Sequence, residues 1–270
     1  SLEAIGGMGK TELALMRSTK FAPTNANWLQ QRMELRGKTV FYEAASGNVR
    51  VTGKGTFLAE DYRKPMASKA DPDPAAPVGA MSGASAQRPS QTVFSWTKSM
   101  ALQQPQRTVT MEGSSTMVHR SGTNVREIPG IEHEPWGTLP TGRTSNMRSE
   151  TMVASFAAAP KPAKPAAAPK KASGLEGGFS WGPLETFRAN RDVTVTDGPY
   201  RVSGQRVDYS AKTQNLFIWG YLDGGEKTNA RVSYENKATG QASNWESPTI
   251  RWNMKTNRIE VDAIRGGGGM

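Results

Sequence analysis

The chain of 270 residues contains no cysteine, and this absence excludes several kinds of site. Without cysteine there is no disulfide framework, no thiol nucleophile, and no cysteine-ligated zinc or iron–sulfur centre. Histidine is almost as scarce, since only His119 and His133 are present. With only two histidines, few residues are available to form a histidine-based metal site or to act as a histidine general base.

Long hydrophobic runs are also missing. No stretch approaches the roughly 18 consecutive apolar residues that a transmembrane helix requires. The chain begins at Ser1 and carries no signal peptide, so we expect it to be the C-terminal part of a longer precursor, which leaves export an open question. Positive charge is in excess, with 34 Lys and Arg against 24 Asp and Glu, and the resulting net charge of +10 favours an anionic partner.

Glycine and proline, by contrast, are abundant, with 28 and 17 residues, and they predict many turns and several linkers. The clearest linker contains AAAPKPAKPAAAPKKAS, in which repeated proline favours an extended chain and lysine keeps it solvated. A stretch with DPDPAAP has no apolar periodicity either. The predicted divisions are β segments at 1–63, 92–156 (with a loop at 124–144) and 179–265, linkers at 64–91 and 157–178, and a Gly-rich tail at 266–270.

Between the linkers, apolar and polar residues alternate with period two, which predicts β-strands. Short runs such as VRVTG, DVTVTD and NLFIWG are rich in β-branched or aromatic residues and end at Gly, Asn or Asp. The segments TELALMR and 27–36 show some helical periodicity, but neither is long enough to indicate a secure helix. The sequence therefore predicts an all-β fold.

An internal repeat is the strongest signal in the chain. LRGKTVFYEAASGNVRVTG at 35–53 aligns without a gap with VSGQRVDYSAKTQNLFIWG at 202–220. The same frame fits WNMKTNRIEVDA at 252–263 and LQQPQRTVTMEG at 102–113. Each unit ends one strand on a large apolar residue, makes a polar turn and starts a return strand with apolar residues on one face. One unit cannot bury that face alone, so we expect successive units to stack.

This unit, G-x-x-V-x-Y followed by a polar turn and a return strand, resembles the OstA/LptA-like periplasmic proteins of lipopolysaccharide transport, named for organic solvent tolerance. The resemblance covers about half of the chain, best at 35–60 and 184–264. It implies an elongated, twisted β-jellyroll, or β-taco, of stacked antiparallel hairpins, here interrupted by the Pro/Ala/Gly-rich linkers. It also implies a periplasmic or envelope location, a role in outer-membrane biogenesis, an anionic glycolipid or other acylated lipid as partner, and head-to-tail contact between like domains.

The groove that this resemblance implies needs an apolar lining with few polar groups. Strand alternation selects ten side chains of the repeat units for that lining. The candidates are Val40, Tyr42, Val49, Val51, Val207, Tyr209, Leu216, Ile218, Ile259 and Val261. Plain core packing between two sheets is the alternative explanation for the same pattern.

Other sites are weakly supported. AIGGMGKT places Gly9, Lys10 and Thr11 as in a phosphate-binding loop, but the first glycine of the motif is replaced by Ala4 and no buried strand precedes it, so we favour a Gly-rich turn. IEHEPW, around His133, matches no metal-ligand spacing, and we expect both histidines to be solvated. Basic residues scattered among aromatics form no nucleic-acid motif, so no nucleic acid is expected.

No catalytic constellation is present, and no cofactor or metal site is predicted. The sequence therefore favours a non-enzymatic envelope protein that holds or passes an acylated, lipopolysaccharide-type glycolipid in an apolar groove. The alternative is a structural β-repeat protein that assembles edge to edge without lipid. If the partner is an anionic glycolipid, cations at the groove rim would meet its phosphates.

Overall fold

A computed structural model describes twelve stretches of the chain. These are residues 2–5, 14–22, 24–43, 45–63, 89–126, 130–139, 141–157, 184–226, 228–236, 239–253, 256 and 258–261. Gly9, Lys10 and Thr11, nearly all of the two predicted linkers and the Gly-rich tail lie outside the described residues.

The described residues confirm the all-β prediction, since their strands form one 15-stranded antiparallel sheet with a single 3-10 turn, η1 (Gly122–Asn124). Of the two segments with some helical periodicity, residues 14–17 lie on β2 and residues 27–36 lie on β3, whereas residues 11–13 lie outside the described residues. The strands are β1 (Leu2–Ile5), β2 (Ala14–Ala22), β3 (Asn25–Glu43), β4 (Asn48–Asp61), β5 (Ser90–Trp96), β6 (Ser99–Gln103), β7 (Thr108–Ser121), β8 (Arg143–Phe156), β9 (Leu184–Asp197), β10 (Tyr200–Ser210), β11 (Asn215–Trp219), β12 (Ala230–Asn236), β13 (Gln241–Ser247), β14 (Thr249–Asn253) and β15 (Arg258–Val261).

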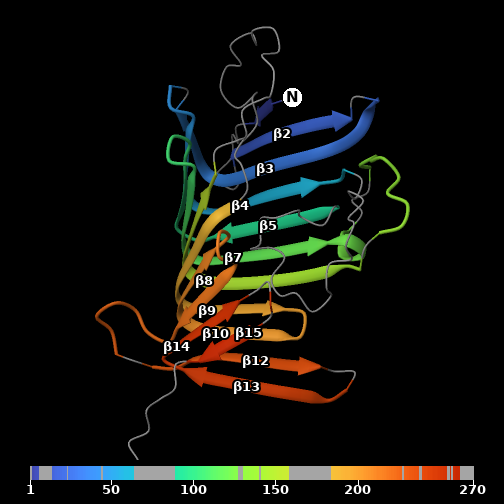
Figure 1. The fold of residues 1–270 in the computed structure, drawn as a ribbon. Coiled ribbons are helices and arrows are strands. Elements are labelled where there is room, and N and C mark those ends of the chain that lie inside the picture. The colour runs from blue at the N-terminus through green and yellow to red at the C-terminus, as the bar shows by residue number, and fades with distance from the viewer. Residues whose placement is uncertain are drawn as a thin grey trace, which may run out of the picture.

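The strands stack almost in chain order, from blue to red in Figure 1. β4 pairs with β5 and β8 pairs with β9, so strands on both sides of each predicted linker are neighbours in the sheet. The three predicted β segments are therefore parts of one sheet rather than separate sheets.

The long strands are irregular at matching positions. The register shifts at Gly37/Thr39 between β3 and β4, at Glu112/Ser115 between β7 and β8, at Arg148/Thr151 between β8 and β9, and at Gly204/Arg206 between β9 and β10. Such bulges bend a strand and re-aim its side chains. Because neighbouring strands are bulged side by side, the bends line up across the sheet as one corner.

The corner is tightly packed at its glycines. Gly53 has a φ of 76°, a conformation that costs glycine little. Its carbonyl accepts a hydrogen bond from the Trp96 indole N–H at 3.1 Å. A Cβ built on Gly37 would lie 2.0 Å from Cγ1 of Val51, so only glycine fits there without movement. Both glycines belong to the repeat, where Gly204 and Gly220 are their counterparts.

The corner divides the sheet into two layers. The repeat layer holds residues 39–43, 48–52, 99–103, 108–112, 151–156, 184–190, 206–210, 215–219, 249–253 and 258–261. The opposing layer holds residues 14–22, 25–37, 55–61, 90–96, 115–121, 143–149, 193–197, 200–204, 230–236 and 241–247.

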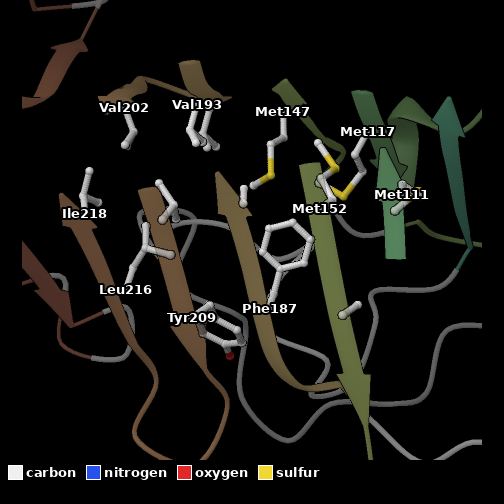
Figure 2. Packing of buried hydrophobic residues seen from close by; sticks show 14 of the residues in the cluster. Met111, Met117, Met147, Met152, Phe187, Val193, Val202, Tyr209, Leu216 and Ile218 are labelled. Carbon is white, nitrogen blue, oxygen red and sulfur yellow. The ribbon is translucent and has the colours of Figure 1, made fainter. Parts of the chain in front are cut away.

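Side chains of the two layers meet in a common core. Figure 2 shows Val202, Val193, Met147 and Met117 of the opposing layer pointing toward residues of the repeat layer such as Ile218. One hydrophobic cluster includes buried residues of both layers. Each layer therefore presents one apolar face to the other.

Candidate functional site

The ten predicted lining residues all lie in the repeat layer, and strand pairing arranges the layer's inward-facing residues in two rows. The corner row, nearer the bend, contains Val40, Val51, Met100, Met111, Met152, Ala189, Val207, Ile218, Ile250 and Val261. The rim row contains Tyr42, Val49, Leu102, Val109, Ala154, Phe187, Tyr209, Leu216, Trp252 and Ile259. Each row takes five of the ten predicted residues.

The predicted residues differ in burial along these rows. Six of them are 0–2% exposed, namely Val49, Val51, Val207, Tyr209, Leu216 and Ile218. Val40, Tyr42 and Ile259 are partly buried and pack against the core cluster. Val261 is 41% exposed, because β15 pairs only with β14 and ends the row.

Methionines line the middle of the interior, and sequence reasoning did not select them. Met100, Met111 and Met152 are consecutive members of the corner row, while Met117 and Met147 pair in the opposing layer. Four of the five are labelled in Figure 2, where their side chains gather between the layers. Methionine has an unbranched, flexible side chain that adapts to irregular spaces. Side chains in this part of the interior can therefore change rotamer more easily than branched or aromatic ones.

The opposing layer carries a row of polar side chains on its inner face. This polar row consists of Thr92, His119, Ser145 and Asp197, which pair in sequence across β5, β7, β8 and β9. The next inward-facing position on each of these strands lies two residues closer to the corner. These positions hold Phe94, Met117, Met147 and Val195. A polar strip thus runs directly beside the methionine-lined region.

The polar row is internally hydrogen-bonded. The Arg143 guanidinium donates to both carboxylate oxygens of Asp197 at 2.6 Å, and the Ser145 hydroxyl donates to Oδ1 of Asp197 at 2.9 Å. Asp197 is 1% exposed and Ser145 is fully buried. Such a bidentate, charge-assisted pair holds both side chains in a defined orientation, and the two charges neutralise each other.

His119 corrects the prediction of a solvated histidine. It is 8% exposed and lies inside the fold, where its Nδ1 is 2.8 Å from Oγ1 of Thr92. Burial lowers the pKa of His119 from 6.5 to about 4; nearby Asp197 opposes the shift and Arg143 adds to it. The ring is therefore neutral at ordinary pH. The alternation along β7 could have predicted this burial, because His119 is two residues from Met117 and therefore lies on the same face of the strand.

His133 lies on the outer face of the opposing layer. Its ring stacks on Trp136 at 3.9 Å and on Tyr62 at 5.5 Å, and the Trp136 indole donates to the Tyr62 carbonyl at 2.7 Å. This anchors residues 131–136 against the end of β4. Within the described part of the chain, no group of three or more potential metal ligands is present.

Two buried polar atoms in the interior lack partners among the described residues. These are the hydroxyl oxygens of Tyr42, in the rim row, and of Ser115, on the Met117 face of β7. A buried hydroxyl without a hydrogen bond costs roughly 1–3 kcal/mol. The interior therefore offers hydrogen-bonding capacity that the described protein groups do not use.

The two layers close on each other at the C-terminal end. The Tyr200 ring in the opposing layer lies 4.7 Å from the Trp252 ring in the rim row. Tyr200 pairs with Asp197 and thus continues the polar row. This contact places the polar row opposite the rim row and fills that end with protein side chains.

Several arginines on the outer faces of the two layers are already paired with carboxylates. Arg206 is bonded to Asp208, and it also lies 4.7 Å over the Trp219 ring. Arg231 is likewise paired with Glu246, and Arg251 with Glu260. These cations contribute less attraction for an anion than the net charge suggests.

Comparison with protein-family models and with curated protein sequences finds no match to this chain. The OstA/LptA-like relationship therefore stays a prediction. No helix in the described stretches is long and apolar enough to cross a membrane.

Proposed function

We propose that this chain is a non-enzymatic lipid-handling protein of the cell envelope, which holds the acyl chains of a glycolipid or related lipid between its two layers. The observation that carries the proposal is the apolar interior between the two layers, whose middle section is lined by three methionines of the corner row and two of the opposing layer. Flexible methionines can move aside for an acyl chain at smaller cost than branched or aromatic residues. The unpartnered hydroxyls of Tyr42 and Ser115 fit a ligand that brings polar groups with it.

The test starts with native mass spectrometry of the chain purified from an envelope fraction, followed by organic extraction. We expect a stoichiometric acylated lipid. Met152→Trp should displace that lipid, because Met152 is fully buried in the corner row. Val153→Trp is the matched control, since the neighbouring residue points to the outer face of the same strand.

Circular dichroism would show that both variants fold. A lipid-free wild-type chain, or equal lipid content in the two folded variants, would contradict the proposal.

A structural role without cargo is the second candidate, and the Tyr200–Trp252 contact favours it by filling one end of the interior. Among the described strands, residues 39–43 of β3 pair only with β4, while β13 and β15 each have one neighbour. Such edges can pair with other chains. A lipid-free chain that forms end-to-end oligomers in sedimentation experiments would establish this alternative.

A further inference from the structure

The polar row has a chemistry that selects among lipids. It lies on the inner face of the opposing layer, beside the methionines and opposite the rim row. A molecule with acyl chains among the methionines would therefore present the groups next to those chains to Thr92, His119 and Ser145.

No uncompensated charge is available in this row. Arg143 lies beside the row, two residues from Ser145 on β8, and both oxygens of the Asp197 carboxylate already accept hydrogen bonds from its guanidinium. His119 is uncharged at ordinary pH because it is buried. A phosphate entering here would lose its hydration and lie near a carboxylate, and both effects are unfavourable.

Hydrogen-bonding capacity is nevertheless available at His119. Its Nδ1 is engaged with Thr92, whereas Nε2 has no partner among the described residues. Depending on the tautomer, Nε2 donates or accepts one hydrogen bond. A hydroxyl, ester or amide can meet either requirement without carrying charge into the interior.

We infer that the interior recognises an amphiphile through an uncharged hydrogen-bonding group beside its acyl chain, with Nε2 of His119 as the contact, and that it discriminates against phosphate at that position. The inference rests on the proposed lipid-handling function. It narrows the ligand to lipids whose chain-proximal groups are neutral, and any phosphates of the same lipid must remain outside the layers.

The experiment uses two probes with the same dodecyl chain, dodecanol and dodecyl phosphate, which differ only in the group next to the chain. Binding of each to the delipidated full chain is measured by native mass spectrometry and by calorimetry. We expect dodecanol to bind at least about tenfold more tightly, because its hydroxyl can hydrogen-bond Nε2 of His119 without bringing a charge beside Asp197.

Three variants assign the effect to His119. His119→Phe keeps an aromatic ring but removes both nitrogens, and it should weaken dodecanol binding about tenfold by removing this hydrogen bond. His119→Gln retains a donor and an acceptor and should keep part of the dodecanol affinity. His133→Phe changes the histidine on the outer face and should leave the preference intact.

The outcomes separate this inference from the proposed function. Equal or tighter binding of dodecyl phosphate by the wild-type chain would overturn the inference and leave lipid handling standing. Unchanged dodecanol binding by folded His119→Phe would overturn the assignment of Nε2 as the contact. Failure of both probes to bind would overturn the proposed function, and the inference with it.

Discussion

Tyr200 and Trp252 belong to different layers, and their ring centroids lie 4.7 Å apart with the planes at 45°. Trp252 is fully buried and pairs with Leu216 and Ile259 in the rim row. The contact joins the two layers at the end away from the corner, in addition to the core that the layers share. It therefore determines whether the C-terminal end of the interior is open or closed.

Replacing Trp252 should open this end. Trp252→Ala removes a fully buried indole, and we expect it to lower the free energy of unfolding by about 3–5 kcal/mol. Trp252→Phe preserves an aromatic contact with Tyr200 and should cost much less. Urea unfolding monitored by circular dichroism would measure both. Equal losses in the two variants would show that the ring contact does not hold the layers together.

The corner should be sensitive to a single methyl group. Gly37→Ala would place a Cβ 2.0 Å from Cγ1 of Val51, and we expect a destabilisation of about 1–3 kcal/mol from overpacking. Adding Val51→Ala removes the clashing methyl, so the double variant should be more stable than the sum of the two single effects predicts. Additive losses in denaturant unfolding would contradict the close packing of this pair.

The sequence repeat predicted one layer well because it contains both halves of each local hairpin. Val49 and Val51, Leu216 and Ile218, and Ile259 with Val261 occupy equivalent places in the rim and corner rows. In these units the paired strands are joined by short turns, so local alternation fixes which side chains share a face.

The opposing layer and its polar row could not be inferred in the same way. Arg143 and Asp197 are 54 residues apart, and β8 and β9 are joined through a predicted linker. Asp197 at the end of DVTVTD looks like a polar strand terminator, and only the pairing with Ser145 shows that it is buried. Likewise, the corner that makes two layers from one sheet arises from bulges aligned across strands, which no single segment encodes.

Breaking the Arg143–Asp197 pair should be strongly destabilising. Asp197→Asn leaves the mostly buried guanidinium without its counter-charge, and we expect a loss of about 3 kcal/mol. Glu246→Gln is the matched control, since its cross-strand pair with Arg231 is exposed and should contribute no more than about 1 kcal/mol. Thermal or urea unfolding at low and high salt would compare the two. Similar losses in both variants would contradict the burial of the polar row.

The neutral state of His119 predicts a specific pH dependence of stability. The pKa of His119 falls from 6.5 to about 4 on folding because the ring is buried, so between these pH values the unfolded chain binds more protons than the folded one. The contribution of neutral His119 to the free energy of unfolding is complete above pH 6.5 and is lost as the pH falls toward 4. The free energy of unfolding falls by about 3 kcal/mol in total over this range. His119→Gln should flatten this part of the profile, whereas His133→Gln should retain it because His119 stays in place. If His119→Gln keeps the full slope in urea unfolding between pH 6.5 and 4, the loss of stability arises from other groups and His119 is not held neutral by the fold.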